Sequence, residues 1–532
     1  MRIAMAAIPC FLGLFGLAGS ATAEEIPDQQ IVRLPVNNDP TISLRVWFKV
    51  GSQDDPPGKP GLAALTAAML TEASTRQNSY EQILQKLFPL AATYSASTSV
   101  EMTVIFGRVH KDNLAAYYPL LRDALLAPAF KQEDLDRLKK ETLNYLQNIL
   151  RYASDEELGK AVLLNEIFAG TPYGHLTSGT IESVQAITLD DLQQFYREHY
   201  TRENLVIGIA GGYDDSLLRR LRSDLAGLPA GKPATGSRGS EGDSPRPTFG
   251  RCPAATTPVV VTGSMAPRKS GPSPGLKVTI VEKEASATAI SVGFPIDVLR
   301  GANDWYPLAV ANSWFGQHRN SSSHLYQVIR EQRGLNYGDY SYIEHFPHAG
   351  MALVPPTNEG RRRQIFEIWI RPVPNEARHF ALRAALRELH HLVDQGMTDA
   401  QCMLTRDFLS KFVLHYAPTT MMRLGYALDD RFYDIPGSHL EIFRNRMHTV
   451  TREEINAAVK KHLQYENMHI VLVTKDAESL KRALVEDLPS PITYPTPKPE
   501  AVLEKDQQIS RFPLKIKVED VKIISVTELF VK

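Results

Sequence analysis

Residues 188–217 read TLDDLQQFYREHYTRENLVIGIAGGYDDSL, and residues 451–480 read TREEINAAVKKHLQYENMHIVLVTKDAESL. A leading Thr, a His, a Glu-Asn pair and a Ser-Leu pair recur in both stretches at one constant offset of 263 residues. An offset kept without a gap over about thirty positions is typical of a duplicated domain. In each copy the Thr is expected to cap an amphipathic helix, and the Glu-Asn turn leads into an apolar strand, at residues 205–210 and 469–473.

Hydrophobic periodicity predicts alternating strands and helices on either side of this repeat. The expected strands are 41–50, 98–108 and 277–294, and the expected helices are 62–72, 80–90, 112–126, 131–151 and 305–315. Such alternation predicts an α/β or α+β fold with two tandem homologous domains, each a mixed sheet covered by helices.

Composition places the domain boundaries. Residues 229–275 are rich in Pro, Gly and Ser and lack helical periodicity, so they are predicted to be a linker. This divides the chain into an N-terminal domain at 24–228 and a C-terminal domain at 276–488. Residues 489–532 begin with a Pro-rich run and are expected to form an extension that packs along the body.

Charge and cysteine content exclude several classes of function. The chain has 532 residues, of which 59 are Lys or Arg and 60 are Asp or Glu, so it has no basic surface excess for binding nucleic acid. Its 3 cysteines, Cys10, Cys252 and Cys402, are too few for a disulfide framework or a Cys-based zinc site. Whether Cys252 and Cys402 pair stays open.

The first 23 residues have the features of a signal peptide. Arg2 precedes an apolar run, and Ala21 and Ala23 form a small-residue cleavage site. The run is shorter than the roughly 20 residues that a stable membrane span needs. We therefore expect an exported mature chain, most simply in a bacterial periplasm and without a stable membrane span; an uncleaved anchor is the alternative.

Several motifs resemble those of the insulinase/pitrilysin-like zinc metallopeptidases, the inverzincins. They are VWFKVGS at 46–52, PGKPGLA at 57–63, TPYG at 171–174, GT at 179–180 and LYQVIREQRGLNY at 325–337. The resemblance extends over about residues 31–485. It implies two peptidase-like domains that enclose a chamber.

The resemblance fails where the family holds its metal. Active members carry His-x-x-Glu-His on the first helix, where two His bind zinc and the Glu acts as general base. Counted from Gly61, these positions are Ala64, Ala67 and Ala68, which form one helical face of methyl groups. The third ligand, a Glu seven residues after Glu141, would fall on Asn148. As a zinc peptidase this chain is predicted to be inactive.

A second pair of family residues is retained. Active members use an Arg and a Tyr, seven residues apart in the second domain, and the matching residues here are Arg330 and Tyr337. A guanidinium and a phenol can both donate to a developing oxyanion. Alternatively, Arg330 belongs to a solvated last helical turn, and Tyr337 is an ordinary strand residue.

Loss of the zinc ligands with retention of this pair predicts a non-catalytic subunit of a heteromeric peptidase. Its partner would be an HxxEH-bearing subunit that holds the zinc, and its substrate would be an unfolded peptide or protein; this chain itself would hold no cofactor. A peptide-binding or scaffold protein without peptidase activity is one alternative. An autonomous metalloendopeptidase with an atypical site is the other.

Overall fold

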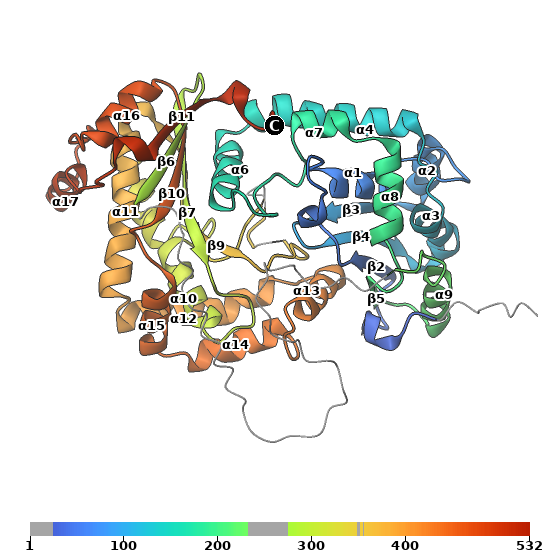
Figure 1. The fold of residues 1–532 in the computed structure, drawn as a ribbon. Helices are drawn as coiled ribbons and strands as arrows, with labels where there is room; N and C mark the ends of the chain where they lie inside the picture. The colour runs from blue at the N-terminus through green and yellow to red at the C-terminus, as the bar shows by residue number, and fades with distance from the viewer. Residues whose placement is uncertain (1–24, 232–274, 348–351, 355) are drawn as a thin grey trace, which may run out of the picture.

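The computed structural model describes residues 25–231, 275–347, 352–354 and 356–532 (Figure 1). The predicted signal peptide, nearly all of the predicted linker, Cys10 and Cys252 lie outside these ranges. Cys402 is buried and is a free thiol.

The sheet topology confirms the duplication. The first sheet has the order β1-β5-β2-β4-β3, and the second has the order β11-β6-β10-β7-β9-β8. Strands β6-β10-β7-β9-β8 of the second sheet correspond in order to the five strands of the first. In both sheets the first pair, β1 with β5 and β6 with β10, is parallel, and the following neighbours are antiparallel. The additional strand β11 is parallel to β6. The strands of the first sheet are β1 (Ile31–Pro35), β2 (Thr41–Phe48), β3 (Thr93–Thr98), β4 (Thr103–His110) and β5 (Leu205–Gly211). Those of the second are β6 (Leu276–Glu282), β7 (Ala287–Ile296), β8 (Asp339–Tyr342), β9 (Gln364–Pro374), β10 (Met468–Thr474) and β11 (Val521–Ser525).

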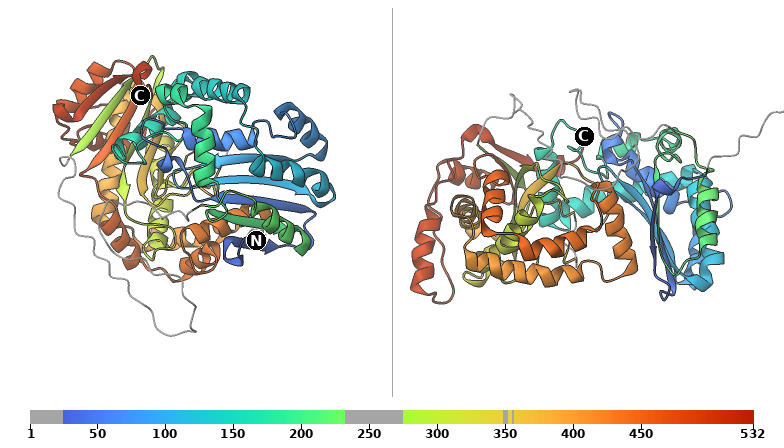
Figure 2. Two further views of the ribbon diagram at one scale, coloured as in Figure 1. Left: turned by 45° about the vertical axis from the view of Figure 1, so that its right-hand side comes forward. Right: turned by 90° about the horizontal axis from the view of Figure 1, so that it is seen from below.

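Helices cover both sheets (Figure 2). The first domain has α1 (Leu62–Thr71), α2 (Tyr80–Leu87), α3 (Leu114–Leu126), α4 (Gln132–Asn144), α5 (Leu150–Tyr152), α6 (Asp155–Ile167), α7 (Ile181–Ala186), α8 (Leu189–His199) and α9 (Asp215–Leu225). The second has α10 (Trp305–Gly316), α11 (Arg378–Gln395), α12 (Asp399–Phe412), α13 (Thr420–Phe432), α14 (His439–Thr449), α15 (Arg452–His462), α16 (Ala477–Val485) and α17 (Glu500–Ser510). As predicted, Thr188 and Thr451 cap the repeated helices, and both form capping boxes.

The two domains exchange one helix each. Helix α6 of the first domain packs on β7 and β10 of the second sheet, while α13 of the second domain packs on β5, β1 and β2 of the first. Leu424 and Leu428 of α13 lie directly above Gly208 of β5, where a glycine leaves them room. Each sheet therefore buries an apolar face only because the other domain covers it.

Two of the predicted strands are wrong, because the structure has a turn or a break inside each of them. The expected strand 98–108 spans a turn, in which Ser99 N–H donates to the Met102 carbonyl at 2.7 Å. Val100 and Met102 in this turn are apolar and buried. The sequence pattern therefore continues through the turn as if it were part of a strand. The expected strand 277–294 is likewise two strands, β6 and β7, separated by residues 283–286, of which all but Ala285 are polar.

The C-terminal extension ties the two domains together. Strand β11 adds to the second sheet beside β6, and the chain then crosses to α7 of the first domain (Figure 1). The N–H groups of Ile181 and Glu182, which have no partner within α7, donate to the carbonyls of Phe530 and Val531 at 2.9 Å each. Arg151 also bonds to the Leu529 carbonyl.

The exchanged packing predicts the effect of filling the space above β5. A Cβ at Gly208 would approach Leu424 Cδ1 to 3.2 Å and Leu428 Cδ1 to 3.3 Å. We expect Gly208→Val to lower the free energy of unfolding by about 1–3 kcal/mol, as overpacked cores do. Urea denaturation measures this loss.

The matched control is Thr93→Val, at an exposed position of β3, which should stay within about 0.5 kcal/mol of the wild type. Equal stability of the Gly208→Val and wild-type proteins would contradict the packing of α13 on this sheet.

Candidate functional site

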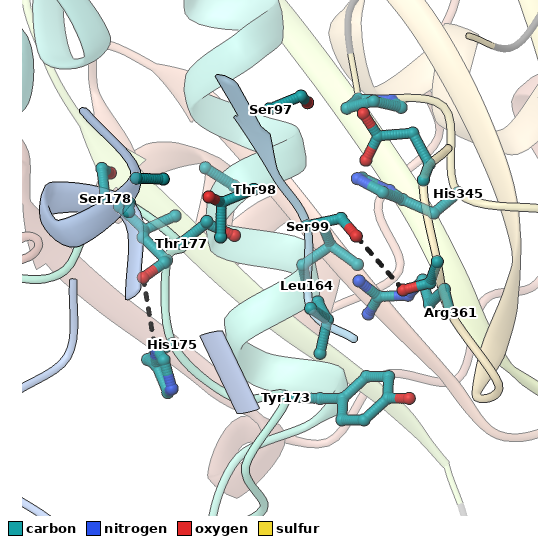
Figure 3. Close-up of a pocket in the computed structure, with 18 of the residues that line it drawn as sticks. Ser97, Thr98, Ser99, Leu164, Tyr173, His175, Thr177, Ser178, His345 and Arg361 are labelled. Carbon is teal, nitrogen blue, oxygen red and sulfur yellow. Dashed lines mark hydrogen bonds between the residues drawn. The ribbon is translucent and has the colours of Figure 1, made fainter. Parts of the chain in front are cut away.

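A cavity of about 440 Å³ lies between the two domains (Figure 3). The first domain supplies α1, the free edge of β3, one face of α6 and the loop at residues 173–178. The second domain supplies His345, Pro347 and residues 359–361. Ala64, Ala67 and Ala68, the predicted positions of the zinc motif, all line this cavity.

The helix that carries the alanines is firmly positioned. Gly61 precedes it with a φ of 95°, and a Cβ there would come within 2.9 Å of the Ser178 carbonyl oxygen, so only glycine fits. The Asp55 carboxylate accepts hydrogen bonds from the N–H groups of Gly61 and Ala63, both at 2.7 Å. Burial raises the pKa of Asp55 to about 7. The fold thus keeps the framework of a zinc helix, but its cavity face has only methyl groups.

Asn148 does not line this cavity. It lies on another surface of the same helical segment, where its side chain donates to Asn144 at 2.8 Å. The residues of this segment that line the cavity are Tyr145 and Leu150. A π-helical turn at Tyr145–Ile149 contains an extra residue per turn, which rotates the following positions relative to a regular helix. Asn148 was placed by the family's seven-residue spacing from Glu141, and this assignment of the third ligand position stays a prediction.

The side chains present do not fit zinc. Methyl groups cannot coordinate a cation, and Tyr145 is not a carboxylate. Two histidines, His175 and His345, line the cavity. However, in the part of the chain that the structure describes, no three His, Cys, Asp or Glu side chains are grouped so that they could hold a metal ion.

Arg330 and Tyr337 are not among the residues that line the cavity. The Arg330 guanidinium pairs with Glu331 and lies over the Tyr326 ring at 5.2 Å. Gly334, with a φ of 72°, turns the chain after this helical segment, and Tyr337 is 78% exposed. A shared role of the pair in stabilising an oxyanion stays a prediction.

An ionic contact between the domains was not foreseen from the sequence. Glu101, in the turn between β3 and β4, is buried. One of its oxygens accepts the N–H of Arg362 at 2.6 Å, the other accepts Arg362 Nη1 at 2.7 Å, and Tyr173 also donates to it. Glu101 belongs to no motif in the sequence, so nothing marks it as an interdomain residue. The run of three arginines at 361–363 is the sequence feature that could have indicated an ionic contact.

A second buried charge cluster lies where α6 meets the second sheet. Lys160 is 3% exposed, pairs with Glu157, and lies 3.5 Å from the centroid of the Trp369 ring. Glu367 on β9 is fully buried, and no ion pair within 4.0 Å offsets its charge among the residues described here. Burial raises the pKa of Glu367 to about 8 against the smaller lowering effects of Lys160 and Arg361.

Comparisons with known proteins agree with this architecture. A family model described as "Insulinase (Peptidase family M16)" matches residues 32–180, and one described as "Peptidase M16 inactive domain" matches residues 186–406. The chain belongs to the insulinase family of peptidases, M16.

Relatives and solved structures match over most of the chain. A Helicobacter pylori protein called "non-peptidase homolog YmxG" is 26% identical over 487 residues, which cover 88% of this chain and 98% of that protein. An uncharacterized zinc protease of Streptomyces coelicolor is 25% identical over 66% of this chain and 68% of its own length. The crystal structure of a peptidase M16 inactive domain from Pseudomonas fluorescens has a TM-score of 0.67 at 22% identity, and the match covers 84% of this chain and 95% of that one.

The described helices include none that combines the length and hydrophobicity required to cross a membrane.

Buried Glu367 predicts a pH dependence of stability. Because its pKa rises from 4.5 to about 8 on folding, the folded protein keeps a proton that the unfolded chain releases between these values. The stability that this group contributes is complete below about pH 4.5 and is lost as the pH rises toward 8. The wild-type protein should therefore lose free energy of unfolding between pH 6.5 and 8.5. We expect Glu367→Gln to make this loss smaller by roughly 1–2 kcal/mol, measured by urea denaturation at both pH values.

The exposed Glu519→Gln substitution serves as the control and should leave the pH dependence unchanged. If the Glu367→Gln and wild-type proteins lose the same stability over this range, Glu367 is not buried as a neutral acid.

Proposed function

We propose that this protein is a pseudo-peptidase that acts as the non-catalytic subunit of a heteromeric M16 peptidase. The observation that carries the proposal is the methyl face of Ala64, Ala67 and Ala68 on the wall of a retained interdomain cavity. A domain that had lost its function altogether would have no reason to keep the cavity. The name of the Helicobacter pylori relative, a non-peptidase homolog, supports the loss of peptidase activity.

The cavity suits an extended peptide. Strand β3 is the outer strand of its sheet, and residues 96–98 of its free edge line the cavity. An unfolded chain can pair with such an edge through backbone hydrogen bonds, which demand little of its sequence. The methyl groups of Ala64, Ala67 and Ala68 line the same cavity and leave room there for small side chains.

The exposure of Tyr337 supports a role toward a partner. A phenol that is 78% exposed is available to a zinc-bearing domain that docks on the second domain. There, Arg330 and Tyr337 would donate hydrogen bonds to the carbonyl oxygen of the scissile peptide as it acquires negative charge. The zinc and the general base would come from the HxxEH-bearing partner.

A specific observation favours the second candidate, a peptide-binding or scaffold protein without chemistry. Neither Arg330 nor Tyr337 lines the interdomain cavity. Peptide capture would then use the cavity alone. The third expectation, an autonomous metalloendopeptidase, has no support in the described segments, where no potential metal-ligand group occurs.

We also propose that the mature protein is exported, in a bacterial periplasm. The support is the signal-peptide pattern of residues 1–23.

Metal content and activity test the subunit role. The purified full chain is expected to contain no stoichiometric zinc and to cleave no unfolded peptide. Co-expression with an HxxEH-bearing relative from the same host should give a complex that holds zinc and cleaves. Stoichiometric zinc with proteolysis in the isolated chain would contradict the proposal, and a stable but inactive complex would favour the scaffold role.

The active complex then tests Arg330 and Tyr337. Arg330→Ala should lower kcat/KM by about 100-fold or more, as removal of one oxyanion donor does in other hydrolytic sites, and Tyr337→Phe should lower it as well. The control is Arg452→Ala, at an exposed position of α15, which should leave the rate unchanged. An unchanged rate for Arg330→Ala excludes the proposed role.

A further inference from the structure

Arg361 is a buried cation on the wall of the interdomain cavity. It is 5% exposed, and the rings of Phe168 and Tyr173 lie 4.9 Å and 5.0 Å from its guanidinium carbon. Its Nε donates to the Arg363 carbonyl at 3.1 Å, but its Nη2 has no hydrogen-bond partner in the described chain. The guanidinium nitrogens point toward Leu164 on the opposite side (Figure 3).

The charge of Arg361 is not offset by contact with an acid. Among the residues described, no carboxylate oxygen lies within 4.0 Å of its guanidinium, whereas neighbouring Arg362 pairs with Glu101 and Lys160 pairs with Glu157. The acids that interact with Arg361 at longer range include Glu359 and Glu367. Burial raises the pKa of both to about 8, so both are mostly neutral at pH 7. An unpaired buried cation is costly, and an anion from a ligand would relieve that cost.

The position of Arg361 also limits where a bound chain can run. At this end of the cavity, the turn after β3 is joined to the second domain by two hydrogen bonds to the Gly360 carbonyl. Glu101 N–H donates at 3.1 Å and Ser99 Oγ donates at 3.4 Å. A peptide that pairs with the free edge of β3 in the parallel direction would bring its C-terminal end to this contact, beside Arg361.

We propose that Arg361 binds the C-terminal carboxylate of a captured peptide, so that the cavity prefers the free ends of unfolded chains. The inference rests on the proposed peptide-binding role of the cavity. Arg361 Nη2 would donate a charge-assisted hydrogen bond to the carboxylate, and the aromatic rings of Phe168 and Tyr173 would hold the guanidinium in place. Specificity would then come from the end of the chain rather than from its side chains.

Three fluorescently labelled peptides test this in the full chain by fluorescence anisotropy. The first is Gly-Ala-Val-Ala-Val-Ala with a free C-terminus, the second is the same peptide with a C-terminal amide, and the third is an amide whose last residue is Glu. We expect the free acid to bind about tenfold or more tighter than both amides, because a hydrogen bond to a charged group is lost in each.

Substitutions then assign the effect to Arg361. Arg361→Gln should abolish the preference for the free acid, and Arg363→Gln, at an exposed position two residues away, should retain it. Circular dichroism and thermal unfolding show whether each variant folds. If Arg361→Gln does not fold, the comparison of the three peptides on the wild type decides.

The outcomes separate this inference from the function on which it rests. Equal binding of the free acid and its amide overturns the carboxylate role of Arg361 but leaves peptide capture intact. Equal binding of the free acid and the Glu amide overturns the assignment to a chain terminus. Binding of none of the three overturns both the inference and the peptide-binding cavity, while the subunit role is judged by activity of the complex.

Discussion

The exchange of α6 and α13 between the domains is the packing on which the rest of the structure depends. Each sheet has an apolar face that its own domain leaves uncovered, and a helix of the other domain covers it. The two halves of the duplicated chain therefore cannot separate without exposing both cores. This mutual covering joins the two domains, and the cavity with the three alanines is lined by residues of both.

The first domain lacks the zinc-binding side chains of its family, but the structure around helix α1 is retained. The glycine contact that orients α1, the carboxylate that caps it and the edge strand beside it are all present, although the helix presents methyl groups to the cavity. In the described part of the chain, the buried charged side chains are not clustered beside α1, as metal ligands would be. They gather at the contact between the domains, around Glu101, Arg361 and Arg362. Among the described residues, the His and Glu side chains that line the cavity are not grouped so that three of them could hold a metal ion.

The sequence predicted the features that depend on local pattern or internal repetition. The constant offset identified the two domains, and the Thr caps identified the repeated helices. The three alanines, counted from Gly61 as the zinc-motif positions, lie together on the cavity wall. The sequence missed features that depend on tertiary contact. The turn after β3 contains the buried apolar residues Val100 and Met102, and Tyr145 rather than Asn148 lines the cavity. No pattern in the sequence indicates which sheet each exchanged helix packs on, or which residue pairs with Glu101.

The position of the zinc in an assembled complex tests the central claim most directly. Anomalous scattering at the zinc edge, from crystals of this chain with its HxxEH-bearing partner, locates the metal without reference to activity. The account predicts one zinc peak in the partner's first domain and none beside Ala64, Ala67 and Ala68. A zinc peak between those alanines and Tyr145 would contradict it.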